Sequence, residues 1–141
     1  MAIAQLENLV KVKQLHLEPP DQGEFDGMVE SAKLQLNDAR SAAISTGSQF
    51  LLAYGAAHPL SLAALRWHGY RSQNRYVVFQ SLTHTLEVEP EKIRLLSDAH
   101  NRRNLAEYEG HVEVSQKLVE SLIAITCELE KLVSALGPVK N

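Results

Sequence analysis

The chain has 141 residues, of which 45% are hydrophobic and 22% charged, enough to bury the core of one domain and to exclude a disordered chain. A single cysteine, Cys127, excludes a disulfide framework and a zinc site built on cysteines. The net charge of −3 argues against nonspecific coating of nucleic acid, and the abundance of leucine and alanine favours helices over strands.

The first segment predicts a short helix from Ile3 to Leu15. The first ten residues carry Glu7 and lack an apolar core, so we expect no signal peptide and a cytoplasmic protein. A loop is expected over His16–Gly23, because Pro19-Pro20 cannot continue a helix.

Two long helices follow. Apolar residues from Phe25 to Ala43 recur at three- and four-residue steps, and Thr46-Gly47 ends this amphipathic helix. Ser48 is the expected N-cap of the next helix, Ser48–His68, which is apolar on all sides and therefore central. Pro59 should kink or split this helix, and its polar residues argue against a membrane span.

Three more helices complete the chain. After a polar loop, Asn74 caps a helix over Arg75–Leu86, and Pro90 starts another that stops at Gly110. The last helix, about Val112–Leu136, has a heptad seam. The seam consists of Leu118, Leu122, Ile125, Leu129, Leu132 and Leu136. The predicted fold is an all-α, up-and-down bundle of five to six helices in one domain, 1–141.

Positive charge is concentrated in one stretch. No acidic residue lies between Asp38 and Glu87, and the four cations there are all arginines. They are Arg40, Arg66, Arg71 and Arg75. Such a patch suits an anionic ligand at one site, but the arginines could equally pair with acids of neighbouring helices. The loop around His68, Arg71 and Arg75 could contact bases and phosphates, or could be an ordinary connection.

The helix that begins at Pro90 carries a second polar group. His100, Arg103, Asn104 and Tyr108 fall within about a 140° arc of a helical wheel. Histidine exchanges protons near neutrality and arginine binds phosphate, so this face could position a phosphodiester. The alternative is a solvated face held by helical ion pairs.

Other chemistry finds no support in the sequence. There is no Gly-rich phosphate loop, no pair of Glu-x-x-His motifs for a di-iron site, and no nucleophile motif, so we expect neither a metal nor a cofactor. His58, beside Pro59, is best explained as a core histidine, and Cys127 as a small buried hydrophobe.

Two motifs resemble the HEPN domain superfamily of helical bundles. The first is Ala53-Tyr54-Gly55-Ala56-Ala57, and the second is His100-Asn101-Arg102-Arg103-Asn104-Leu105-Ala106-Glu107-Tyr108. The resemblance covers about Phe25–Leu136 and leaves residues 1–24 as an addition. HEPN proteins are often metal-independent ribonucleases or toxins, and they act as homodimers that share one cleft.

The resemblance assigns roles by position. Arg103 would contact phosphate with Asn104 as its polar neighbour, whereas Tyr108 stands where the family has its catalytic histidine. Neutral tyrosine is a poor base at pH 7, so His100 or His111 would have to move the proton. The expected site residues are therefore Arg103, Asn104, Tyr108 and His100, with ligand contacts from Arg71, Arg75, Arg102 and His68.

Three functions remain open at this point. The resemblance favours an RNA- or nucleotide-binding module that is non-catalytic or weakly active. The alternatives are a metal-independent endoribonuclease toxin with a cognate antitoxin protein, and a structural dimerisation bundle. In each case we expect a homodimer and no membrane association.

Overall fold

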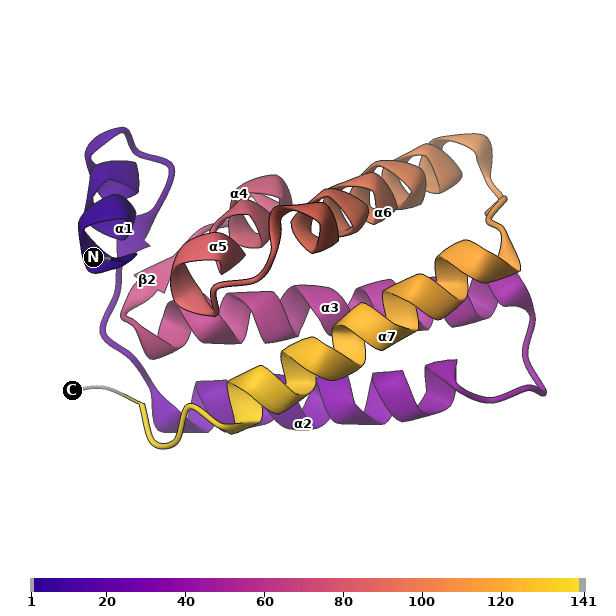
Figure 1. Ribbon diagram of the computed structural model, residues 1–141, viewed down its shortest axis with the longest axis horizontal. Helices are drawn as coiled ribbons and strands as arrows, with labels where there is room; N and C mark the ends of the chain where they lie inside the picture. The colour runs from indigo at the N-terminus through magenta and orange to yellow at the C-terminus, as the bar shows by residue number, and fades with distance from the viewer. Residues whose placement is uncertain (1, 140–141) are drawn as a thin grey trace.

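The computed structural model describes residues 2–139 and is an all-α bundle, as the sequence predicts (Figure 1). Six described helices are longer than one turn, and α5 adds a single turn. In chain order the elements are α1 (Ala2–Lys11), β1 (His16–Leu17), α2 (Gln22–Ala39), α3 (Thr46–Trp67), β2 (Tyr70–Arg71), α4 (Arg75–Gln80), α5 (Leu82–Thr85), α6 (Pro90–Glu109) and α7 (Gln116–Ser134).

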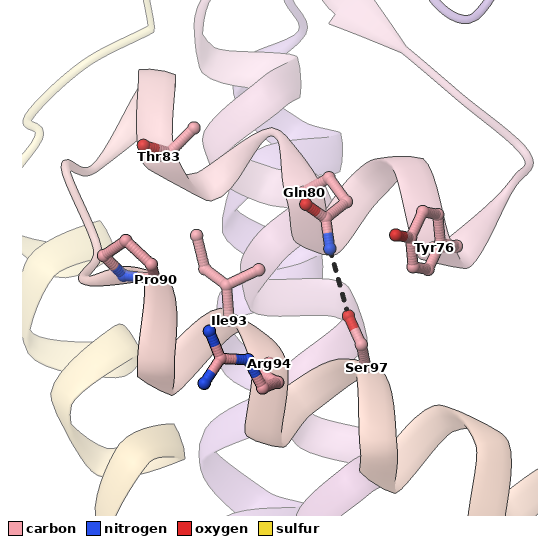
Figure 2. Close-up of a pocket in the computed structure, with 7 residues that line it drawn as sticks. All are labelled: Tyr76, Gln80, Thr83, Pro90, Ile93, Arg94 and Ser97. Atoms are coloured by element: carbon pink, nitrogen blue, oxygen red, sulfur yellow. Dashed lines mark hydrogen bonds between the residues drawn. The ribbon is translucent and has the colours of Figure 1, made fainter.

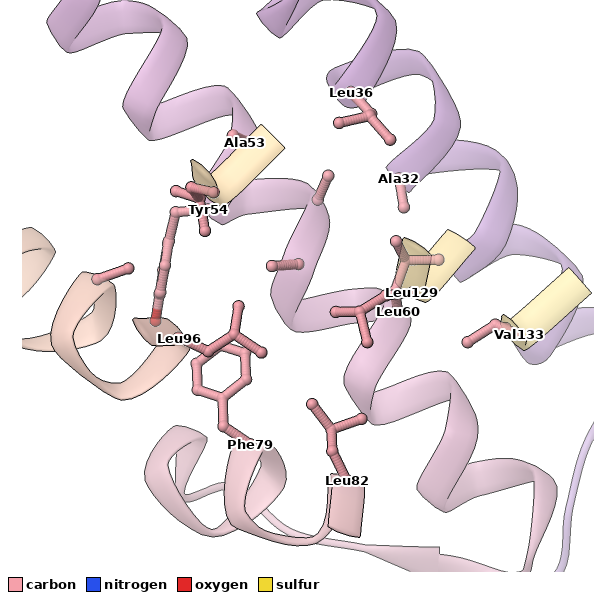
Figure 3. Packing of buried hydrophobic residues seen from close by; sticks show 14 of the residues in the cluster. Ala32, Leu36, Ala53, Tyr54, Leu60, Phe79, Leu82, Leu96, Leu129 and Val133 are labelled. Carbon is pink, nitrogen blue, oxygen red and sulfur yellow. The ribbon is translucent and has the colours of Figure 1, made fainter. Parts of the chain in front are cut away.

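The α3 helix is the centre of the bundle, as expected from its apolar surface on all sides. It packs against α2 and α7, and it also contacts α4 and α6. Figure 3 shows Leu60 of α3 facing Leu129 of α7, and Phe79 of α4 near Leu96 of α6. None of the helices within residues 2–139 combines the length and the apolar character needed to cross a membrane.

The helix α3 runs through Pro59 without a division, so of the two predicted effects of this proline, a kink or a split, the split is wrong. A proline removes one backbone hydrogen bond and crowds the carbonyl four residues earlier. Here the neighbouring helices bury α3 on several sides, with Leu60 and Ala56 fully buried. Packing of this kind outweighs the local cost of the proline.

Several helix ends differ from the expected positions. The α2 helix stops at Ala39, and the cap of α3 is Ser45, whose hydroxyl accepts a hydrogen bond from the Ser48 amide at 3.1 Å. Ala43, expected on the buried face of α2, is exposed in the connection. Ser45 and Ser48 are both good caps, and only the packing of α3 decides between them.

Other predicted ends are also corrected. The α1 helix stops at Lys11, before Lys13, which has a positive φ of 64°. The predicted helix over Arg75–Leu86 divides into α4 and α5 at Ser81, whereas Asn74 caps α4 as expected. The α7 helix begins at Gln116, four residues later than predicted, with Ser115 as its N-cap. Ile3, expected on the inner face of the first helix, lies outside the described side chains.

The buried face of α7 is rotated from the predicted seam. Its fully or nearly fully buried residues are Val119, Leu122, Thr126, Leu129 and Val133. Leu118, Ile125 and Leu132 are only partly buried and border the core. The 3-4 spacing therefore predicts the helix correctly, but α2 and α3 together cover a face centred to one side of the leucines.

Arg66 joins the N-terminal segment to the end of α3. Its guanidinium is 1% exposed and donates hydrogen bonds to the Glu24 carboxylate at 2.7 Å and to the carbonyls of Glu18 and Pro19 at 2.9 and 2.7 Å. Arg71 binds the carboxylates of the same two glutamates from the β1–β2 side. Burial alone would raise the pKa of Glu24, but the hydrogen bonds from both arginines outweigh burial and lower it.

We expect Arg66→Ala to lower the free energy of unfolding by about 2–4 kcal/mol, because it removes a fully buried side chain, one of the two arginine donors to Glu24, and the donor to the carbonyls of Glu18 and Pro19. Arg71→Ala is the matched control, because it touches the same carboxylates from a position with 27% side-chain exposure and should cost only about 1 kcal/mol. Urea denaturation measures both. Equal losses for the two variants would contradict a special role for Arg66.

Candidate functional site

Tyr54 is the centre of a polar cluster where α3, α4 and α6 meet. The tyrosine belongs to the buried face of α3 and is 2% exposed, and its ring extends toward α6 (Figure 3). Its hydroxyl lies 2.8 Å from His100 Nδ1 and accepts a hydrogen bond from Arg75 Nη1 at 3.4 Å. We refer to Tyr54, His58, Arg75, His100, Arg103 and Asn104 as the Tyr54 cluster.

The hydrogen bonds of His100 indicate its tautomer. The Asn104 amide nitrogen lies 3.2 Å from Nε2 and donates to it, since an amide nitrogen has no other role. A neutral imidazole that accepts at Nε2 carries its proton on Nδ1, which then donates to the Tyr54 oxygen. The phenolic O–H is consequently left as a donor, because its oxygen already accepts from His100 and Arg75.

Two guanidinium groups lie over the ring of Tyr54. The Cζ atoms of Arg75 and Arg103 are 5.7 and 5.8 Å from the ring centroid, within the range of a cation–π contact. Arg103 also pairs with Glu107 at 3.0 Å, but that carboxylate is 63% exposed, so the pair contributes only tenths of a kcal/mol. Among the described residues no carboxylate pairs with Arg75, whose polar partner is the Tyr54 hydroxyl.

The positive charge of the cluster lowers the pKa of two histidines. Burial, followed by the charges of Arg75, His100 and Arg103, lowers the pKa of His58 to about 4. Burial, followed by the charges of Arg75 and Arg103, also lowers the pKa of His100. Both imidazoles are therefore neutral at pH 7, and a bound anion would favour their protonation.

This arrangement is suited to an anion such as a phosphate or a phosphodiester. Two arginines supply charged donors, while His100, Asn104 and the Tyr54 hydroxyl are hydrogen-bonding groups at the same place. A neutral imidazole can also accept a proton at neutral pH. The cluster can thus bind a phosphodiester and contains one group able to act as a base.

The structure brings together three of the four residues expected in the catalytic group: Arg103, Asn104 and His100. Tyr108 is 92% exposed and lies outside the Tyr54 cluster within one chain. Of the helical ion pairs considered as the alternative, the structure contains the pair of Arg103 with Glu107, whereas His100 contacts Tyr54 and Asn104 instead.

The expected ligand-binding residues divide between different parts of the fold. Arg75 belongs to the cluster, whereas Arg71 is held by Glu18 and Glu24. Arg102 lies on the exposed side of α6 and donates to the Glu113 carbonyl at 3.4 Å. His68 is the C-cap of α3 and packs edge-on against the ring of Trp67. The two uses proposed for the arginines, ion pairing and ligand binding, are thus distributed over different residues.

Tyr54 and His58 are the members of the cluster that the sequence did not assign to a site. Both lie on the apolar helix α3, where a core role explains each of them equally well. The usable signal was their spacing of four residues, which places a hydroxyl and an imidazole on the same side of a helix. Without the positions of α4 and α6, that spacing could not be connected to Arg75 and Arg103.

A cavity of about 430 Å³ lies between α4, α5 and α6 (Figure 2). Tyr76 and Gln80 line it from α4, and Ile93, Arg94 and Ser97 line it from α6. The Gln80 amide nitrogen donates to the Ser97 hydroxyl at 3.2 Å across the opening. The cavity therefore combines a planar ring with several polar groups.

Neither protein-family models nor curated proteins nor solved structures provide a match to this chain. Within residues 2–139, no three histidine, cysteine, aspartate or glutamate side chains converge in a group that could hold a metal ion. The assignment of function therefore depends on the chemistry of the Tyr54 cluster.

The depressed pKa of His58 should make stability depend on pH. The folded pKa of about 4 lies below the ordinary value of 6.5, so the unfolded chain binds more protons between these values. This contribution, on the order of 3 kcal/mol, is fully present above about pH 6.5 and is lost as the pH falls toward 4. Urea denaturation across that range should show a shallower loss of stability in His58→Gln. The control is His16→Gln, which alters an exposed histidine, and equal slopes in both variants would contradict the assignment.

Proposed function

We propose that this protein is a HEPN-like module that binds RNA or a nucleotide in the cytoplasm and is non-catalytic or only weakly active. The observation that supports this proposal is the convergence of Arg75 and Arg103 on the Tyr54 ring, with His100 hydrogen-bonded to its hydroxyl. Phosphate is the common anion that benefits from two guanidinium groups and neutral donors at one place. An overall charge of −3 limits nonspecific binding elsewhere on the surface.

Weak or absent catalysis is consistent with the place of Tyr108. A neutral phenol is a poor base at pH 7, and Tyr108 lies 92% exposed, away from the cluster in its own chain. It can still donate a hydrogen bond to a phosphate supplied from outside the chain. Tyr108 therefore fits binding better than proton transfer.

A second candidate function, a metal-independent endoribonuclease controlled by an antitoxin protein, is supported by His100. This imidazole is neutral at pH 7 because its pKa is lowered, and it adjoins Arg103 and Asn104. A ribose hydroxyl that displaced the Asn104 amide would meet the lone pair of Nε2. The third possibility, a purely structural bundle, does not explain why Arg75 has no carboxylate partner among the described residues.

We expect the protein to bind a single-stranded RNA oligonucleotide, measured by fluorescence anisotropy. Arg75→Ala and Arg103→Ala should each weaken binding about tenfold and reduce the salt slope by about one, because each removes one charged phosphate contact. Arg40→Ala is the matched control, because it removes an exposed arginine of the same acid-free stretch. Unchanged binding by both Arg75→Ala and Arg103→Ala would overturn the proposed site.

The same RNA reports on catalysis when it is incubated with chelator and analysed for fragments. Slow or absent cleavage supports the binding module. Efficient cleavage that is lost in His100→Ala would instead favour the endoribonuclease, with His100 as the base.

We propose further that the protein is a homodimer that joins the faces beside the two Tyr54 clusters. Leu51 is 45% exposed beside Arg103 and Glu107, where these residues border a cavity of about 330 Å³. Light scattering coupled to size exclusion should give twice 15.7 kDa at tens of micromolar. Leu51→Asp should weaken the dimer, whereas Leu34→Asp, at a 64% exposed position of α2, should not. A monomeric wild-type protein would contradict this arrangement.

A further inference from the structure

The cavity between α4, α5 and α6 is a feature of the structure that the proposed phosphate contacts do not use. Its volume of about 430 Å³ lies within the range usual for sites that hold small organic ligands, roughly 300–1,000 Å³. On both walls, residues that line the cavity are close in sequence to residues of the cluster. Tyr76 follows Arg75 directly on α4, and Ser97 precedes His100 by three residues, or roughly 4.5 Å of helix rise, on α6.

The lining has the chemistry of a base-binding site. Tyr76 is 52% exposed and offers a planar ring on which a base can stack, while Ile93 provides an apolar contact from α6 (Figure 2). Gln80 uses one amide N–H on Ser97, so its carbonyl oxygen and second N–H are available. An amide with both groups available can form a pair of hydrogen bonds with one edge of a purine.

Arg94 adds a second group of the same kind. It is exposed at the rim of the cavity, and no described carboxylate pairs with it. A guanidinium forms two parallel hydrogen bonds with the N7 and O6 acceptors of guanine, as an amide does with N7 and N6 of adenine. Gln80 and Arg94 therefore both match purine edges, whereas the smaller pyrimidines lack the N7 acceptor.

We propose that this cavity receives the purine base of the nucleotide whose phosphate is bound by Arg75 and Arg103. The inference rests on the proposed function of the Tyr54 cluster and adds the base to be recognised. The phosphate and the base would then be held by consecutive residues of α4 and by successive turns of α6. Because Tyr76, Gln80 and Arg94 are exposed, the base can enter without rearrangement of the core.

Calorimetric titration with adenosine and guanosine monophosphates, uridine and cytidine monophosphates, and inorganic phosphate tests the inference. At least one purine nucleotide should bind about tenfold more tightly than both pyrimidine nucleotides and inorganic phosphate. Tyr76→Ala should remove about tenfold of the purine affinity and leave the affinity for inorganic phosphate unchanged. Ser97→Leu, which fills the floor of the cavity, should have the same selective effect, and Leu34→Ala is the control for an exposed apolar side chain.

The outcomes separate this inference from the proposed function. If Tyr76→Ala and Ser97→Leu bind every ligand as the wild type does, while Arg103→Ala weakens all of them, the base site is wrong and the phosphate site remains. Equal binding of purine and pyrimidine nucleotides by the wild type, or no binding of any nucleotide, also overturns the base site. If neither Arg75→Ala nor Arg103→Ala weakens RNA binding, the proposed function itself is overturned. Thermal unfolding of Ser97→Leu shows whether this variant remains folded. If it does not, the affinities of Tyr76→Ala alone decide whether the cavity binds the base.

Discussion

The burial of α3 on several sides is the constraint on which the rest of the structure depends. No formal charge occurs on this helix before Arg66, so water cannot cover any of its faces at low cost. The helices α2, α7, α4 and α6 contact it along its length. The positions of all four are consequently set by one helix, including those of the residues that α4 and α6 bring to Tyr54.

The central position of α3 also explains two groups of polar contacts along this helix. At its C-terminal end, Arg66 is buried by the N-terminal segment and is satisfied by Glu18, Glu24 and backbone carbonyls. At its N-terminal half, the hydroxyl of Tyr54 reaches the edge of the core, where Arg75 and His100 meet it. Arg66, which is paired with carboxylates, stabilises the fold. Arg75 and Arg103, which have no strong carboxylate partner among the described residues, remain available for a ligand.

The electrostatics of the Tyr54 cluster connect stability with function. Burial and two nearby guanidinium groups keep His58 and His100 neutral, because protonation would add charge to a region that is already positive. The same excess of positive charge is unfavourable for folding and favourable for the binding of an anion. A ligand phosphate would therefore relieve repulsion within the fold as well as bind to it, and the cluster is more consistent with a binding site than with a structural ion pair.

The sequence by itself determined the helical class, the central place of α3, and the caps or ends at Asn74 and Gly110, because these depend on composition, periodicity and local backbone preferences. It also identified Arg103, Asn104 and His100 as one polar face. Only the tertiary structure decided which arginines are paired, which serine caps α3, and which face of α7 is buried. The physical reason is that each of these choices is nearly balanced locally. Contacts between residues far apart in the chain, such as Tyr54 with Arg75 and His100, decide between the alternatives. The spacing of residues within one helix does not reveal these contacts.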